Sequence, residues 1–323
     1  MFEKKRILFV HGRDRKPPAE DLHRLWLRAL KVGLEDVPDG LRRAHLSSLN
    51  ACCSSSYWAT VVPFALPDSP VTVMEIEGCL NELIRERKEL GPDRFHVGKA
   101  GIAGGALKSM LLTIGDALSQ SLTIKDNVTK GLLADVRLYT EDQYIADRMR
   151  RSLEEGLRAA WANDEEVCLL THSMGTGIAY DVMWRFSYRD EPEYHDYRGY
   201  RVKLFVTMGS PLGDPMYQSF LFAHHHKGED RYFPTNIDHW CNFSTLGDIV
   251  CHDSTLGNDF HKEMRSRGLL KDAPSGNSDY VRLYNPYKDG KGKHNPHKSY
   301  GYLVQPKLAK WVLGFLRSAA PIV

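Results

Sequence analysis

Residues 167–177 read VCLLTHSMGTG, in which a short apolar run leads into a histidine, a serine and two glycines. An apolar run of this length that ends at glycine predicts a buried strand followed by a tight turn. Ile178, Val182 and Phe186 then recur at helical spacing, so the turn should lead into a helix. Ser173 is therefore either a nucleophile on a sharp strand-to-helix turn or a polar residue at the end of a strand.

The residues around Ser173 favour the nucleophile. A sharp turn between strand and helix lifts the serine above the carboxyl end of a sheet, and it places the next N–H at a helix start, where negative charge is stabilised. Such a turn needs small residues two positions before and two positions after the serine. Gly175 meets this need, whereas Thr171 stands where glycine is the usual choice. The segment is therefore a relaxed form of G-x-S-x-G.

Strands and helices alternate along the rest of the chain. Apolar runs predict further buried strands within 6–12, 201–213 and 239–250, and 47–58 reads as a loop. Helical periodicity is found at 19–36, 73–90, 140–161 and 306–319, and Thr140 with Gln143 fits a capping box for the third of these. This alternation predicts an α/β fold, with a mostly parallel sheet and helices on both of its faces.

Composition limits the class of protein. The 323 residues suffice for a single α/β domain over 1–323, with an inserted region within about 40–130, and the net charge of +2 argues against a nucleic-acid partner. The six cysteines show no CxxC spacing. A run of only four apolar residues precedes His11, too short for a signal peptide or a membrane span, so we expect a soluble cytoplasmic protein. Neither brief contact with a membrane nor any oligomeric state is excluded.

Two further segments supply the partners that a nucleophilic serine needs. In α/β hydrolases the acid and then the histidine follow the serine along the chain. Asp248 lies just past a predicted strand, and His297 lies shortly before the last helix. The rivals for the acid are Asp253 and Asp259.

For the base, His294 is the rival to His297, and His252 lies too near the acid. His172 is expected to point away from Ser173. The consecutive histidines 224–226 cannot all face one ion from a regular element, and there is no HExxH pattern, so no metal and no cofactor are expected.

Several of these segments together resemble one family. FVHG, LLTHSMG, VTMGSPLG, W-x-N followed by GDIV, HKSYGYL and ADVRLY resemble α/β-hydrolase-fold serine esterases, in particular the lipase-like group that includes the GPI inositol-deacylase-like proteins. The resemblance spans 6–20 and 131–316. It implies Ser173 as nucleophile, His297 as general base and Asp248 as the acid that orients it. It also implies oxyanion donors from the main chain of Met174 and of the Gly12–Arg13 turn.

The resulting expectation is a serine hydrolase that cleaves a small-molecule or lipid-like carboxylic ester through an acyl-enzyme. A thioester or an amide could replace the ester with the same three side chains. Two other classes stay open: a hydrolase-fold interaction module without catalysis, and an effector that acts on membrane lipids.

An apolar stripe within 101–124 has three possible uses: packing on the sheet, a contact between subunits, or a cap over the site. Leu107, Leu111 and Ile114 belong to this stripe, and glycines at 101, 104, 105 and 115 could serve as hinges. An ester site gains from an apolar cover that excludes water. We therefore expect these three side chains to line or cover an acyl pocket.

Overall fold

The structure is a computed structural model, and it describes residues 4–12, 16–35, 43–59, 73–90, 138–251 and 254–318. Within them, six strands form one sheet in the order β2-β1-β3-β4-β5-β6, and every neighbouring pair is parallel. The strands are β1 (Lys5–Val10), β2 (Cys53–Ser56), β3 (Glu166–His172), β4 (Val202–Met208), β5 (Ile237–Thr245) and β6 (Asp279–Leu283). The prediction of an α/β fold with a parallel sheet is confirmed.

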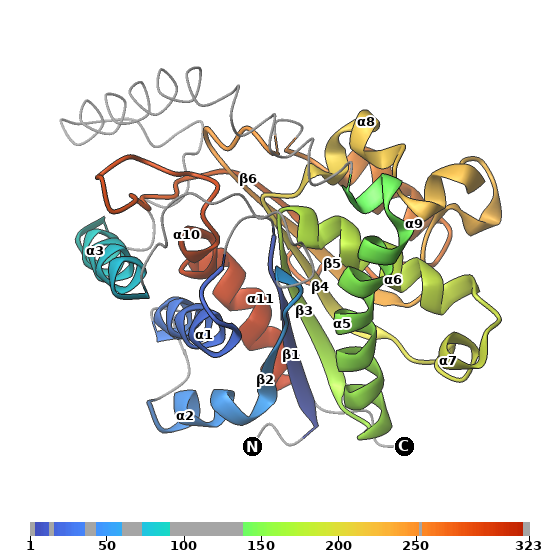
Figure 1. The fold of residues 1–323 in the computed structure, drawn as a ribbon, viewed down its shortest axis with the longest axis horizontal. Helices are drawn as coiled ribbons and strands as arrows, with labels where there is room; N and C mark the ends of the chain where they lie inside the picture. The colour runs from blue at the N-terminus through green and yellow to red at the C-terminus, as the bar shows by residue number, and fades with distance from the viewer. Residues whose placement is uncertain are drawn as a thin grey trace.

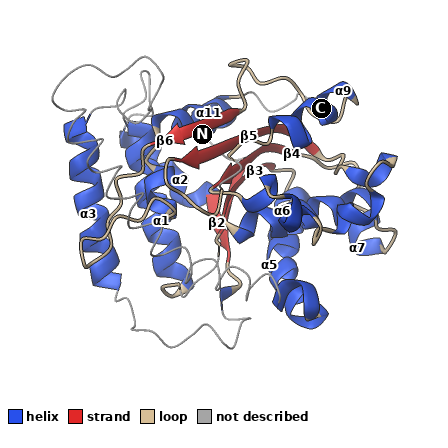
Figure 2. Cartoon of the chain, turned by 90° about the horizontal axis from the view of Figure 1, so that it is seen from above, coloured by secondary structure: helices blue, strands red, loops and turns tan. Residues whose placement is uncertain are grey.

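Helices cover both faces of this sheet (Figures 1 and 2). One face carries α1 (Ala19–Glu35), α3 (Val73–Leu90), α10 (Ser299–Leu303) and α11 (Pro306–Arg317), and the other carries α5 (Gln143–Ala162) and α6 (Met174–Tyr188). Further α-helices are α2 (Arg43–Cys52), α7 (Pro192–His195), α8 (Pro215–Gln218) and α9 (Lys262–Ser266).

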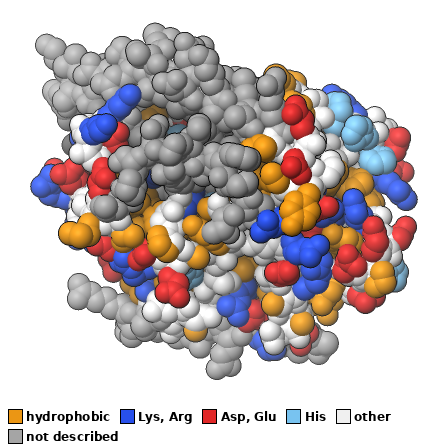
Figure 3. Space-filling model, viewed as in Figure 1, with side chains coloured by type: hydrophobic (Ala, Val, Ile, Leu, Met, Phe, Trp, Pro, Cys, Tyr) orange, Lys and Arg blue, Asp and Glu red, His pale blue; other side chains and the backbone are white. Residues whose placement is uncertain are grey.

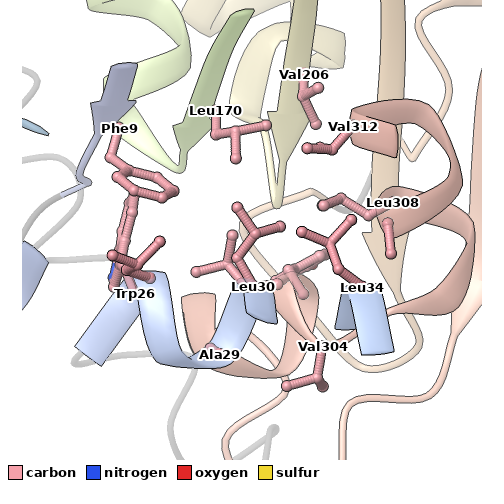
Figure 4. Packing of buried hydrophobic residues seen from close by; sticks show 14 of the residues in the cluster. Phe9, Trp26, Ala29, Leu30, Leu34, Leu170, Val206, Val304, Leu308 and Val312 are labelled. Carbon is pink, nitrogen blue, oxygen red and sulfur yellow. The ribbon is translucent and has the colours of Figure 1, made fainter. Parts of the chain in front are cut away.

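Two apolar cores hold the helices to the sheet. Successive residues of β1 alternate between them, because side chains of a strand point to opposite faces: Ile7 and Phe9 join one core, and Leu8 and Val10 join the other. In Figure 4 the first core is seen from close by. Its labelled strand residues Phe9, Leu170 and Val206 lie opposite side chains of α1, of α11 and of the residue that follows α10, namely Trp26, Ala29, Leu30, Leu34, Val304, Leu308 and Val312. A sheet buried on both faces explains why its strands read as continuous apolar runs.

Two local predictions are wrong. The segment 47–58 is not a loop, because it contains the end of α2 and the edge strand β2, which pairs with β1 from Ile7–Cys53 to Val10–Ser56. Its small polar residues carry no apolar pattern, so pairing with β1 decides its structure. The capping box at Thr140 is also wrong. Asp142 is the N-cap of α5, and its side chain accepts the N–H of Ile145 at 3.0 Å.

The expected cap residues Leu107, Leu111 and Ile114 lie outside the described residues, so their role stays a prediction. None of the helices in the described ranges is both long and apolar enough to cross a membrane. On the face shown in Figure 3, basic and acidic side chains are interspersed over the part of the chain that the structure describes.

Candidate active site

The sheet topology marks one position at its carboxyl edge. From β1 the chain first goes to β2 on one side, and it later returns to β3 on the other side of β1. In open parallel sheets, ligands bind outside the carboxyl ends of the strands at such a switch point. Gly12 follows β1 and Ser173 follows β3, so both lie at the carboxyl ends of the two strands that flank this point.

The backbone at Ser173 adopts a conformation that is rare for a residue with a side chain. Ser173 lies between the last residue of β3 and the first residue of α6, and its φ is 55° and its ψ −132°. Glycines make room for this turn. A Cβ on Gly175 would lie 2.5 Å from the carbonyl oxygen of His11, and one on Gly12 would lie 2.5 Å from the Cβ of Ser173. The predicted sharp turn is present, and strained backbone of this kind is concentrated at functional sites.

Thr171, the departure from the glycine pattern, is accommodated in the sheet. Its side chain is buried, and its hydroxyl donates a 2.7 Å hydrogen bond to the carbonyl oxygen of Val206 in β4. A buried hydroxyl with a partner avoids the cost of desolvation without compensation. Threonine therefore fits this position without opening the turn at Ser173.

Ser173, His297 and Asp248 form one hydrogen-bonded chain. The Nε2 of His297 lies 2.9 Å from the Oγ of Ser173, and its Nδ1 lies 2.8 Å from the Oδ2 of Asp248. An ionised carboxylate only accepts, so Nδ1 carries the proton and Nε2 accepts from the serine hydroxyl. The three side chains come from the β3–α6 turn, from the turn after β5 and from the segment before α10. The side chains singled out in the sequence thus meet at one edge of the sheet, in the geometry that a general base needs.

Asp248 is held as a carboxylate. Besides His297, it accepts the N–H of Val250 at 2.9 Å and the hydroxyl of Tyr302 at 2.6 Å. Burial alone would raise the pKa of Asp248. The electrostatic interaction and hydrogen bond with His297, together with the Tyr302 and Val250 donors, instead lower this pKa to about 2. The group facing Nδ1 of His297 is therefore negatively charged at neutral pH.

Gly209, at the end of β4, makes room for this pair. Its φ is +55°, and a Cβ there would lie 2.8 Å from Oδ2 of Asp248 and 3.0 Å from Nδ1 of His297. A side chain at this position would therefore press against the contact between the imidazole and the carboxylate.

His172 has a structural role that its sequence context does not indicate. This residue ends β3, and its Nε2 donates to the carbonyl oxygen of His297 at 2.7 Å. Burial and the adjacent His297 hold the pKa of His172 well below its usual range, so the ring is neutral. Instead of bonding to Ser173, it fixes the backbone that carries His297.

A second histidine, His11, fixes the turn after β1. Its Nε2 accepts the backbone N–H of Trp58 at 3.1 Å, its Nδ1 donates to the carbonyl oxygen of Gly12 at 2.7 Å, and its ring stacks on that of Trp58. The Trp58 indole N–H in turn donates to the carbonyl oxygen of His11 at 3.1 Å. Burial first, and then the charge of Lys16, lower the pKa of His11 to about 3.

The predicted oxyanion donors are only partly described. Met174 is the first residue of α6, so its N–H has no acceptor within the helix and stands beside Ser173. Gly12 lies against Ser173 from the other side. Arg13 lies outside the described residues.

The rival residues do not join this chain where they are described. Asp259 lies in the π-turn Gly257–His261, and the ring of His294 stacks on that of Tyr284. Asp253 and His252 lie outside the described residues. The described ranges contain no group of three histidine, cysteine or acidic side chains that could hold a metal ion, and 224–226 form part of a 3₁₀ turn.

No family model matches the chain, and searches of curated proteins and of solved structures also return no match.

Proposed function

We propose that this chain is a serine hydrolase of the α/β-hydrolase fold that cleaves a lipid-like or acyl carboxylic ester. One observation carries the proposal: Ser173, His297 and Asp248 form a continuous hydrogen-bonded chain that begins on a strained turn at the switch point of a parallel sheet. Their order along the chain, serine then aspartate then histidine, is the order of α/β hydrolases.

The geometry gives each group a role. The Oγ of Ser173 attacks the ester carbonyl carbon while Nε2 of His297 takes its proton, and Asp248 stabilises the imidazolium that forms. The N–H of Met174 and the turn after β1 face the developing oxyanion. The imidazolium then protonates the departing alkoxide, which leaves an acyl-enzyme. His297 next takes a proton from water, and the hydroxide attacks the acyl carbon. The imidazolium then returns this proton to Oγ of Ser173 as the carboxylic acid leaves.

Turnover of a series of p-nitrophenyl esters by the purified protein tests this proposal. Ser173→Ala and His297→Ala should each lower kcat at least about a thousandfold. Their circular dichroism and Tm should stay close to those of the wild type. Matched thioester and anilide substrates would show whether the ester is the preferred bond.

Asp248→Asn and Asp259→Asn form a matched pair for the acid. The first should lower kcat by orders of magnitude, because the imidazole loses the group that orients it, and the second should leave kcat near the wild-type value. Esterase activity that survives in Ser173→Ala would refute the proposal. A wild type without activity on any of these substrates would favour a non-catalytic interaction module.

A further inference from the structure

A pocket of about 590 Å³ lies at the opposite edge of the sheet from Ser173. Its walls come from the amino ends of four strands, at Glu166 of β3, Lys203 of β4, Asp238 of β5 and Tyr280 of β6, and from the outer side of α11. Ser173 follows the carboxyl end of β3, so the length of that strand puts roughly 20 Å between the pocket and the serine. The pocket is therefore separate from the candidate active site.

The lining of this pocket is positively charged. It contains four lysines, namely Lys203, Lys271, Lys307 and Lys310, but only two carboxylates. The buried carboxylate of Asp238 bonds to Lys203 at 3.1 Å and to Lys271 at 3.0 Å, and Arg201 also donates to it.

The second carboxylate, Glu166, is bound by Lys5. Each of the two carboxylates therefore has at least one cationic partner. The four lysines and two carboxylates of the lining together carry a net charge of +2.

Two of the four lysines that line the pocket account for this excess charge. Lys307 and Lys310 are exposed and lie one helical turn apart on α11. Within the described ranges, no hydrogen bond or ion pair engages either ammonium group. Both are available to an anion that enters the pocket.

The walls between these charges are apolar. Leu204, Pro274, Trp311 and Phe315 line the pocket together with the ring of Tyr280. The Trp311 indole donates to the hydroxyl of Tyr280 at 3.0 Å, and that hydroxyl lies 3.0 Å from the Oγ of Ser275. The polar atoms of both aromatic side chains are therefore satisfied within the wall. A concave, mostly apolar site of this size with a few polar groups is typical of small-molecule binding.

We propose that this pocket binds an amphipathic anion, a free carboxylate with an apolar chain. The carboxylate lies near Lys307 and Lys310, and the chain packs against Trp311 and Phe315. The concave shape selects a single small molecule over the flat surface of a membrane. The proposal is independent of the hydrolase function, because it uses none of the residues of the candidate active site.

One glycine offers a clean test of the site. Gly314 lines the pocket, and a Cβ built on it meets no atom within 4 Å. Gly314→Leu therefore meets no clash at its Cβ and should place an apolar side chain in the pocket wall, and it replaces a residue that weakens a helix. Gly78 in α3 also meets no atom within 4 Å, so Gly78→Leu is a matched control outside the pocket.

Calorimetric titration of the full chain with dodecanoate below its micelle concentration tests the proposal. The wild type should bind it saturably. Gly314→Leu should weaken binding at least about tenfold, since it displaces buried chain. Its Tm should be unchanged or higher, and Gly78→Leu should bind like the wild type.

The charge is tested with Lys307→Gln/Lys310→Gln, which should weaken binding about fivefold because two exposed ion pairs are lost. Lys227→Gln/Lys262→Gln, on exposed lysines elsewhere, should bind like the wild type. Dodecanol and acetate, which lack either the charge or the chain, should each bind far more weakly than dodecanoate.

Absence of binding to the wild type would overturn the proposal, and so would dodecanoate affinity that is unchanged in both Gly314→Leu and the Lys307/Lys310 double variant. Dodecanol binding as tight as dodecanoate binding would show an apolar pocket without anion selectivity. Binding to anionic vesicles in place of the free carboxylate would identify a membrane contact, and it would equally contradict the proposal.

Discussion

The phenol of Tyr302 donates a 2.6 Å hydrogen bond to Oδ2 of Asp248, the same oxygen that accepts the Nδ1 proton of His297. Burial, and then the charge of Asp248, hold the pKa of Tyr302 well above its usual range, so the phenol keeps its proton and acts as the donor. The phenol oxygen also accepts the backbone N–H of Thr245 at 3.2 Å. Tyr302 therefore ties the turn that carries the acid to α10, which follows His297 closely in the chain.

Tyr302→Phe keeps the ring and removes only the donor. The pKa of Asp248 should rise above its present value of about 2, and the carboxylate should hold the imidazole less firmly. We expect kcat for a p-nitrophenyl ester to fall about tenfold with little change in KM, the usual size for losing a hydrogen bond to a charged group. An unchanged kcat with a lower Tm would show that Tyr302 serves stability alone.

Gly175→Ala tests the tightness of the turn at Ser173. The added Cβ would meet the carbonyl oxygens of His11 and Val10 at 2.5 and 2.8 Å, and backbone atoms cannot easily yield. We expect a loss of about 1–3 kcal/mol in the free energy of unfolding and a large fall in esterase activity.

Gly156→Ala is the matched control for that variant. Gly156 lies in α5, and a Cβ on it would make an ordinary contact of 3.6 Å with the methyl groups of Leu8. The stability of this variant should therefore be equal to that of the wild type or slightly higher. If both alanine variants behaved alike in thermal melts and activity, the turn would not be as tight as described.

Asp181, a buried carboxyl of α6, predicts a pH-dependent stability. Burial raises its pKa to about 6, although Tyr139, Arg150 and the N–H of Phe222 act in the opposite direction. Because the folded pKa lies above the unfolded value of 3.8, the folded state holds this proton more strongly between the two. The contribution of Asp181 to the free energy of unfolding should therefore fall by on the order of 2 kcal/mol as pH rises from about 4 to about 6. The buried neutral histidines His11 and His172 contribute in the opposite direction over this range, because they bind a proton only in the unfolded state.

Urea unfolding at the two ends of this pH range measures the effect. The free energy of unfolding of Asp181→Asn, taken relative to the wild type, should rise by on the order of 2 kcal/mol between about pH 4 and about pH 6. That of Asp196→Asn, at an exposed position, should differ from the wild type by the same amount at both pH values. A difference between Asp181→Asn and the wild type that does not change with pH would contradict the raised pKa of Asp181.

The sequence predicts those elements whose structure is determined by residues close to them in the chain. An apolar run predicts the strand before Ser173, and the glycine at 175 predicts the turn, because both signals depend only on neighbouring residues. The edge strand Cys53–Ser56 has no such signal, since its small polar residues become a strand only by pairing with β1. Likewise, no spacing rule finds the contacts of Tyr302 with Asp248, 54 residues away, or of His172 with His297, 125 residues away.

The most direct test of the central claim is covalent labelling of Ser173 by a fluorophosphonate probe, with the modified peptide identified by mass spectrometry. The wild type should be labelled at Ser173 alone, Ser173→Ala should not be labelled, and His297→Ala should react far more slowly because the serine has lost its base. Labelling of Ser173→Ala to the same extent as the wild type, or a folded wild type that remains unmodified, would contradict the assignment of Ser173 as the nucleophile.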